Sequence, residues 1–266
     1  MKQYGSFRSA IADLVIRMGR SSHGVHTEKW QGFDIKDKPE AAMKELLNVD
    51  LQVPLNGEDL KRYRIDIEPN LPWADDHFEE RVQGSPVNPG RTWLTWPWAN
   101  KADESRQFYG KFSHTYMERY WPKDPVDTEP NGFPMMGHRF PYGDLNDVVD
   151  LLAREPNTRQ AYLPIFFPED TGAKHGNRVP CTLGYHFIQR NGYLHIHYPI
   201  RSCDMYRHFR DDLYLTTRLL LWVLDELRKQ DEHWKEIKPG FFTMWIGSLH
   251  MFINDWNKVY HEPSDT

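Results

Sequence analysis

One cysteine in the second half of the chain stands where it could act as a nucleophile. Cys181 follows Pro180 at the start of a strand-like run, in RVPCTLGYHF, and Arg201 opens the stretch RSCD further along. A cation close to a thiol favours the thiolate, which is the reactive form. A lone cysteine in an apolar strand is also a common small core residue. The residue types alone leave both interpretations open.

Carboxylates and a histidine follow in the same region. Asp204 ends RSCD, Asp212 lies in FRDD, and His250 lies in GSLH. A carboxyl group accepts hydrogen bonds when ionised and also donates one when protonated. We therefore expect the chemistry of this protein in the region from Cys181 to Asp212, with His250 further along the chain.

The hydrophobic pattern predicts the elements that must position these residues. Asn191-Gly192 between two strand-like runs predicts a tight hairpin. The other expected elements are a helix over Tyr4 to Gly19, a short helix around Asp75 to Val82, a helix from Gly143 stopped by Pro156, a strand over 161–167, an apolar helix over 213–230 and a final strand over 240–255 that runs into a functional turn. The stretch from Asp50 to Lys123, rich in Pro and Trp, is expected to be a long structured excursion.

Length and charge restrict the class of protein. A chain of 266 residues with a net charge of -5 is expected to form a single domain over 1–266 and not to offer a broad nucleic-acid surface. Two cysteines, no N-terminal leader and no long apolar run predict a cytoplasmic protein without a membrane partner. The hairpin carries alternating histidines at positions His186, His195 and His197. This alternation is typical of a hydrated or hydrogen-bonded strand face, and we expect no metal site.

The order and spacing of PC, the hairpin, RSCD and GSLHMFIN resemble the thymidylate synthase family. The upstream stretch GDLNDVVDLLAREPNTRQAYLPIF is similar to the family's helix, turn and strand before the catalytic cysteine, so the resemblance covers about 143–254. It implies an α/β (α+β) fold with a large mixed sheet flanked by helices. It also implies a homodimer with a shared phosphate site, a nucleotide substrate, and 5,10-methylenetetrahydrofolate as co-substrate.

The resemblance implies a role for each matching residue. Cys181 adds to carbon 6 of a pyrimidine and is activated by Arg201, and Glu80, preferred over Glu79, relays protons near the base. The remaining residues are Arg201, Ser202, Arg159 and Arg20 for phosphate, His250 for the sugar, and Asp204, Trp93 and Trp96 for the folate and the pocket wall. Gln160 stands where a second phosphate arginine is usual, and Phe252 stands where the family has a sugar-binding tyrosine.

The base-reading position separates the subfamilies. Thymidylate synthases carry an asparagine eleven residues after the motif arginine, and this chain carries Asp212. An Asp there resembles the phage deoxycytidylate hydroxymethylases, as does Thr182 in place of the synthase histidine. The resemblance therefore implies a phage dCMP 5-hydroxymethyltransferase. The alternatives are a thymidylate synthase, a dCMP methylase, a CMP hydroxymethylase and a non-catalytic nucleotide-binding homologue.

Overall fold

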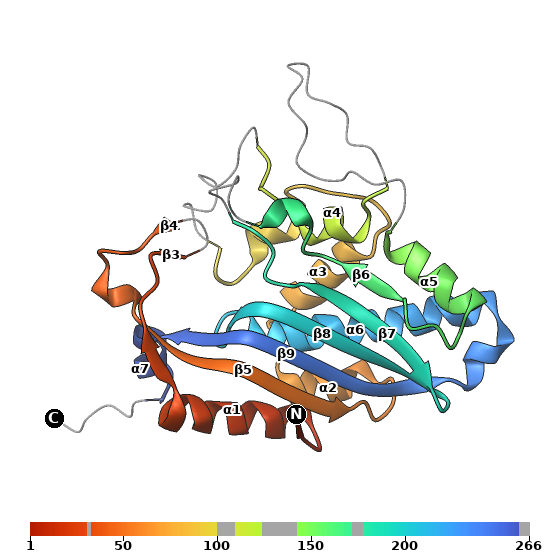
Figure 1. The fold of residues 1–266 in the computed structure, drawn as a ribbon, viewed down its shortest axis with the longest axis horizontal. Helices are drawn as coiled ribbons and strands as arrows, with labels where there is room; N and C mark the ends of the chain where they lie inside the picture. The colour runs from red at the N-terminus through yellow and green to blue at the C-terminus, as the bar shows by residue number, and fades with distance from the viewer. Residues whose placement is uncertain (31–32, 100–109, 124–142, 172–177, 261–266) are drawn as a thin grey trace.

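The computed structural model describes residues 1–30, 33–99, 110–123, 143–171 and 178–260, and a mixed sheet lies at its centre (Figure 1). The strand order is β1-β5-β9-β8-β7-β6, and β2 pairs with β5. The strands are β1 Lys2–Gln3, β2 His23–Val25, β5 Met43–Pro54, β6 Tyr162–Pro164, β7 Gly184–Arg190, β8 Tyr193–Asp204 and β9 Lys238–Phe252, and β3 Lys29–Trp30 and β4 Phe33–Asp34 form a separate pair. The central strands β8 and β9 are parallel, whereas β5 runs antiparallel to β9.

The predicted hairpin is confirmed. β7 and β8 pair antiparallel, and the turn between them holds Asn191 at φ 52° and Gly192 at φ 80°. Two successive left-handed residues match the twist of the flanking strands, and an Asn-Gly pair adopts this geometry at low cost. This turn fixes the register of β8, the strand that carries RSCD.

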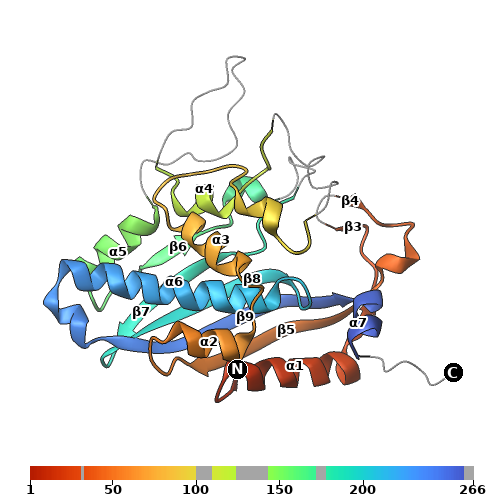
Figure 2. The same ribbon diagram turned by 180° about the vertical axis from the view of Figure 1, so that it is seen from behind.

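The principal helices cover one face of the sheet, as Figures 1 and 2 show from opposite sides. The helices are α1 Phe7–Ser21, α2 Leu60–Ile67, α3 Trp73–Arg81, α4 Tyr116–Tyr120, α5 Leu145–Arg154, α6 Phe209–Gln230 and α7 Ile253–Tyr260. The long helix α6 lies behind the central strands in Figure 1 and in front of them in Figure 2, with α2 and α3 beside it. None of the helices within the described ranges is long and apolar enough to cross a membrane.

Among the described residues, no helix lies over the central strands on the opposite face of the sheet (Figure 1). On β8 the even-numbered residues from Leu194 to Ile200 are buried, while the odd-numbered ones are half-buried or exposed. We call the uncovered surface the open face; it includes Ile188, His195, His197, Thr243 and Trp245.

Strand pairing is interrupted at one level across three adjacent strands. Asn48, Gly247 and Arg201 are the residues missing at this level from the ladders of β5, β9 and β8; the β8–β9 ladder has a further break between Leu194 and Ile196. Asn48 has φ 52°, and a Cβ on Gly247 would lie 2.7 Å from the carbonyl oxygen of Arg201.

The core-facing set of side chains changes at this row. On β9 the buried apolar residues are Phe242, Met244 and Ile246 before the row, and Leu249 and Met251 after it. The residues that alternate with the second set, Ser248 and His250, therefore become available to a polar site at this end of the sheet.

Most predicted elements are present, with two corrections. The helices expected at Tyr4 to Gly19 and Asp75 to Val82 correspond to α1 and α3. The expected excursion over Asp50 to Lys123 is wrong in part, because it includes the second half of the central strand β5 and all of α2; its residues 100–109 lie outside the described part of the chain. The final strand leads into the helix α7 and not into a turn.

Candidate active site

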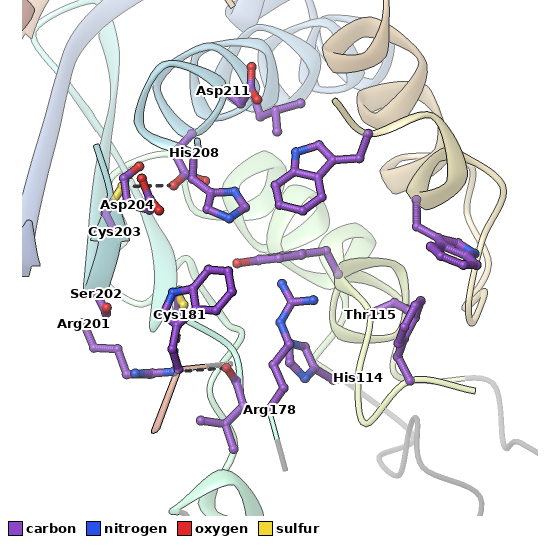
Figure 3. Close-up of a pocket in the computed structure, with 18 of the residues that line it drawn as sticks. His114, Thr115, Arg178, Cys181, Arg201, Ser202, Cys203, Asp204, His208 and Asp211 are labelled. Carbon is purple, nitrogen blue, oxygen red and sulfur yellow. Dashed lines mark hydrogen bonds between the residues drawn. The ribbon is translucent and has the colours of Figure 1, made fainter. Parts of the chain in front are cut away.

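A cavity of about 460 Å³ lies at the end of the sheet beyond the interrupted row (Figure 3). Its floor comes from alternate residues of three strands, whose pairing places Glu45 opposite His250 and His250 beside Asp204. The remaining walls come from α3, α4, the start of α6, and the segments around residues 92–96 and 178–181. Many of the residues predicted from the sequence meet here: Cys181, Arg201, Ser202, Asp204, Asp212, His250, Trp93 and Trp96.

Cys181 lies beside Arg201 on one side of the cavity. Arg201 donates through Nε to the carbonyl of Pro180 (2.9 Å) and through Nη2 to the carbonyl of Val179 (3.1 Å), and Nη2 lies 3.9 Å from the sulfur of Cys181. The backbone before the cysteine therefore holds the guanidinium next to the thiol.

The electrostatic balance at Cys181 corrects the sequence-based expectation. Burial raises the pKa of the thiol, and the opposing effects of Arg201 and Arg178 are smaller. The expected influence of Arg201 has the predicted sign, yet the net pKa shift is upward. The thiol of the free protein is therefore mainly protonated at neutral pH, and attack on a substrate needs a nearby proton acceptor.

Asp212 is surrounded by protein at the start of α6. Burial raises the pKa of its carboxyl to about 7, against the lowering effect of Arg81. The Sγ of Cys203 donates to Oδ2 of Asp212 at 3.4 Å. A carboxyl that is half protonated at neutral pH can both donate and accept at one ring edge.

A chain of hydroxyl groups lies between Cys181 and Asp212. Tyr116 from α4 is 2.9 Å from the hydroxyl of Thr182, which is 2.9 Å from the hydroxyl of Tyr198. Tyr198 in turn contributes a hydrogen bond to the carboxyl of Asp212. These groups can pass protons between the residue after the cysteine and the carboxyl of Asp212.

Helix α3 presents a histidine and an arginine to the cavity rather than the predicted glutamate. Trp73, His77 and Arg81 line the cavity at successive turns of the helix. Arg81 donates through Nε to Nε2 of His77 (3.0 Å), and Nδ1 of His77 lies 2.8 Å from the hydroxyl of Thr92. Because Nε2 accepts, Nδ1 carries the proton of the neutral imidazole.

Glu80 is buried next to His77, with Oε2 3.9 Å from Nδ1 of that histidine, but it is outside the set of residues that line the cavity. It accepts from the hydroxyl and the N–H of Thr92 and from the N–H of Arg91. Burial opposes its ionisation, but these bonds and the nearby His77 lower its pKa to about 2. The structure therefore connects Glu80 to the cavity only through Thr92 and His77, and the alternative Glu79 pairs with Arg218 on the surface.

Two arginines face the cavity from the cysteine side, and two others do not. Figure 3 shows Arg178 and Arg201 on the same side as Cys181. Arg159 is exposed in the loop after α5, where its carbonyl contacts Nε2 of His186, and Arg20 is exposed in the last turn of α1. The two predicted phosphate residues Arg159 and Arg20 are thus absent from the cavity lining in this chain.

Asp204 is buried and already carries an ion pair. Its Oδ2 accepts from Nη1 of Arg207 at 2.7 Å, and its Oδ1 accepts from the N–H groups of Tyr206 and Arg207 at 3.0 Å. Arg207 also pairs with Asp255 at the start of α7 (2.5 Å). The carboxyl of Asp204 is therefore fixed at the edge of the cavity.

Aromatic rings form the wall opposite the strands. Trp96 stacks on His208 with centroids 4.9 Å apart, and Trp93 meets Phe112 edge to face at 5.2 Å. The buried indole nitrogen of Trp96 has no hydrogen-bond partner among the described residues. A planar ligand could stack on this wall and accept from that nitrogen.

Sequence reasoning missed several residues that line the cavity, namely His77, Arg81, Tyr116, Arg178 and His208. A signal existed for α3, because Trp73, His77 and Arg81 recur every four residues on one helical face. The three-residue spacing in RVPC places Arg178 close to Cys181, whereas no spacing could identify Tyr116, because it approaches the cavity from α4.

Comparisons with known proteins agree with the resemblance at the level of fold. No protein-family model matches the chain. Two proteins named "Putative thymidylate synthase" match over 113 residues: one from Methanosarcina barkeri strain Fusaro at 30% identity and one from Methanosarcina acetivorans at 28%. Each match covers 42% of this chain and 47% of the relative, so the chain spans about half the length of the curated relatives it matches.

A solved structure matches over much more of the chain. It is thermostable thymidylate synthase A from Bacillus subtilis, with a TM-score of 0.63 and 12% identity over 94% of this chain and 80% of that one. The predicted fold class is confirmed, because the mixed sheet flanked by helices matches this structure along nearly its whole length. The chain has the thymidylate synthase fold.

Proposed function

We propose that the protein is a folate-dependent deoxycytidylate 5-hydroxymethyltransferase, which converts dCMP, methylenetetrahydrofolate and water to 5-hydroxymethyl-dCMP and tetrahydrofolate. The observation that carries the proposal is the pairing of a cysteine with a raised-pKa carboxyl in one cavity of the thymidylate synthase fold. The fold and the similar sequences support pyrimidine C5 chemistry in general. The carboxyl of Asp212 supports cytosine in particular.

Asp212 would read the amino edge of the base. One carboxyl oxygen accepts from the exocyclic amine of cytosine, and the protonated oxygen donates to ring nitrogen 3. The pKa of about 7 makes the protonated form available at neutral pH. Cys203 donates to Oδ2, which restrains the rotation of the carboxyl and presents a defined edge to the base.

Cys181 would add to carbon 6 of the pyrimidine. Addition makes carbon 5 electron-rich, so an unreactive ring becomes a nucleophile toward a one-carbon unit. As the thiol attacks, its proton can leave through the hydroxyl groups of Thr182 and Tyr116, which lie 2.9 Å apart. Arg201 beside the sulfur stabilises the thiolate as it forms.

Arg201, Ser202 and Arg178 support binding of the 5′-phosphate. The guanidinium groups of Arg178, just before Cys181, and of Arg201 on β8 both line the cavity, and a guanidinium binds phosphate through paired donors. His250 lies on the strand floor, where a ribose hydroxyl would face it. A nucleotide held this way has its base directed toward Asp212.

The aromatic wall fits a folate co-substrate, which when bound supplies the one-carbon unit at the methylene oxidation level. Trp96 and Trp93 offer ring faces, and the indole nitrogen of Trp96 offers a donor that finds no acceptor within the described ranges. Asp204 is held at the same end of the cavity by Arg207 and can accept from an amino group.

A homodimer would form through the open face of the sheet. Ile188, His197 and Trp245 leave partly apolar surface on a face without helices, and such surface is typical of an interaction site. Arg159 lies next to this face, because its backbone carbonyl contacts His186, and it is not among the residues that line the cavity of its own chain. In a dimer, Arg159 would serve the phosphate site of the second copy.

The proposal is tested by product identity. The protein is incubated with dCMP, dUMP or CMP and labelled methylenetetrahydrofolate, and the nucleotide product is weighed by mass spectrometry. A hydroxymethyl product from dCMP is expected. Methylation of dUMP with release of dihydrofolate would instead identify a thymidylate synthase, and no release of tritium from carbon 5 of any nucleotide would indicate a non-catalytic homologue.

A further inference from the structure

We propose that His208 binds and deprotonates the water that becomes the hydroxymethyl oxygen, and so decides which product the enzyme makes. This inference rests on the proposed function, because it concerns the second half of that reaction. His208 is also one of the cavity residues to which the sequence resemblance gives no role.

The imidazole of His208 has no structural task that explains its place. His208 is the N-cap residue of α6, yet its side chain makes no capping hydrogen bond. No hydrogen bond to either ring nitrogen is found within the described residues. Its ring lies in the cavity lining, and Figure 3 shows it pointing into the cavity from α6, opposite Cys181.

A second polar group at the same corner is also unsatisfied. Trp96 stacks on His208 with ring planes 14° apart, and the indole nitrogen of Trp96 is buried without a partner in the part of the chain that is described. Buried polar atoms in folded proteins are nearly always paired with protein or with ordered water. An N–H donor and an imidazole acceptor side by side therefore provide a site for one small polar molecule.

The corner lies close to the reacting carbon. Asp212 follows His208 by one helical turn, and its N–H donates to the carbonyl of His208 at 2.8 Å, so the two side chains share a face of α6. In a pyrimidine, carbon 5 lies between carbon 4, whose amine Asp212 would bind, and carbon 6, which Cys181 would attack. A methylene group on carbon 5 therefore projects from the edge between Asp212 and Cys181, where His208 can reach it.

The step balances without any further reactant. After tetrahydrofolate leaves, carbon 5 carries an exocyclic C=CH₂ while carbon 6 is bonded to sulfur. The oxygen of water bonds to the CH₂ carbon, one water proton moves to the ring nitrogen of His208, and the electron pair of the double bond moves to carbon 5. That pair then forms the C5=C6 bond and expels the thiolate of Cys181, with no change in oxidation state.

The environment keeps the imidazole in the accepting form. Burial lowers the pKa of His208 to about 4, while Asp204 opposes that shift and Arg178, His250 and Arg207 add to it. The ring is therefore neutral throughout the physiological range and always offers a lone pair to water.

Two substitutions separate water activation from packing. His208→Phe keeps a ring on Trp96 but removes the acceptor, and His208→Asn keeps a polar acceptor in a smaller side chain. In a single turnover, we expect His208→Phe to retain the rate of tritium release from carbon 5 of dCMP within about threefold, while the rate of hydroxymethyl-dCMP release falls at least about fiftyfold. The stalled adduct on Cys181 should appear in the intact protein mass, and His208→Asn should recover part of the product.

Each other result overturns the inference. Equal losses of tritium release and product would give His208 a general role in binding. A higher KM for folate with an unchanged product rate would make it a folate contact, and unchanged catalysis would remove it from the mechanism. If the wild-type protein releases no tritium from dCMP, or makes a methyl product, the proposed function itself fails. If the wild type makes hydroxymethyl-dCMP and the His208 variants make it equally well, only the assignment of His208 fails.

Discussion

The sulfur of Cys203 donates a hydrogen bond to Oδ2 of Asp212 at 3.4 Å, and this contact gives the two oxygens of the carboxyl different surroundings. Oδ2 accepts from Cys203 on the side of the carboxyl that faces β8, so the opposite side of the carboxyl is left for the base. A neutral carboxylic acid alone would pair with the edge of either cytosine or uracil, since both edges offer one donor and one acceptor. Fixed orientation is therefore part of the selectivity.

Asp212→Asn should move the preference from dCMP toward dUMP. An amide whose NH₂ faces carbon 4 of the base and whose oxygen faces ring nitrogen 3 donates to the carbonyl of uracil and accepts from its ring N–H, but it offers no acceptor to the amine of cytosine. We expect kcat/KM for dCMP to fall by about a hundredfold or more relative to that for dUMP. An unchanged ratio of the two kcat/KM values would contradict the base-reading role.

Binding of dCMP should weaken as the pH rises above about 7. Asp212 is protonated below its raised pKa of about 7 and ionised above it, and only the protonated form donates to ring nitrogen 3. Calorimetry should show the Kd of the wild type for dCMP rising by up to about tenfold per pH unit above that pKa. Asp212→Asn is the control, because titration of the dCMP phosphate affects both proteins equally. Cys203→Ala removes a bond that lowers this pKa, so the midpoint should move to higher pH.

Arg178→Ala should raise the KM for the nucleotide by about ten- to a hundredfold with a smaller effect on kcat, because it removes a phosphate contact and leaves Cys181 in place. Arg178→Lys should recover part of the loss. The measurement is steady-state kinetics with dCMP at two salt concentrations, and the variant should also lose part of the salt dependence of KM. A loss confined to kcat would instead assign Arg178 to the chemistry of the thiol.

Glu80→Gln should lower stability more than it lowers C5 chemistry. The carboxylate accepts from three donors, and an amide in its place turns an N–H toward at least one of them. The free energy of unfolding should fall by about 1–3 kcal/mol, measured by urea denaturation. A loss of tritium release above about a hundredfold at unchanged stability would instead establish Glu80 as the proton relay.

The same residue gives a signature in acid. The pKa of Glu80 is lowered to about 2, so its contribution to stability is present above the unfolded value near 4.5 and disappears as the pH falls toward 2. Glu80→Gln should lack this part of the acid destabilisation.

Mixing two inactive variants should restore activity if Arg159 serves the partner's site. In an Arg159→Ala homodimer both sites lack the arginine, and in a Cys181→Ala homodimer both sites lack the cysteine. A mixed dimer has one site that contains both Arg159 and Cys181. Random exchange of subunits should recover about a quarter of wild-type activity. No recovery, in a mixture that mass spectrometry shows to contain mixed dimers, would place Arg159 outside the phosphate site.

The sequence predicted the part of the fold that rests on local patterns. The hairpin follows from Asn191-Gly192, and α6 follows from its apolar residues. The strand β5 was missed because half of it falls in a stretch read as irregular, and its place beside β9 comes from pairing with residues about 200 positions away. Likewise Cys181 and Asp212 could be placed by motif spacing, whereas Tyr116 enters the cavity only through tertiary packing.

The net charge state of Cys181 also lay beyond sequence reasoning. The proximity of Arg201 was anticipated, but the depth of burial that outweighs it depends on α4 and the aromatic wall, which are distant in the chain. The position of Glu80 shows the same limit, because a rotation of α3 by one residue decides whether a glutamate or a histidine meets the cavity.

Gly247 bears no functional group, yet the polar half of three strands depends on it. A methyl group there would collide with the backbone of Arg201, and relieving that collision would shift β8 against β9 at the level where the alternation of inward side chains changes phase. The side chains of Ser248, His250 and Asp204 would then all be displaced from their positions in the cavity. Substrate affinity in this protein can thus be lost through a residue that touches no ligand, and a search for specificity variants gains by leaving this glycine untouched.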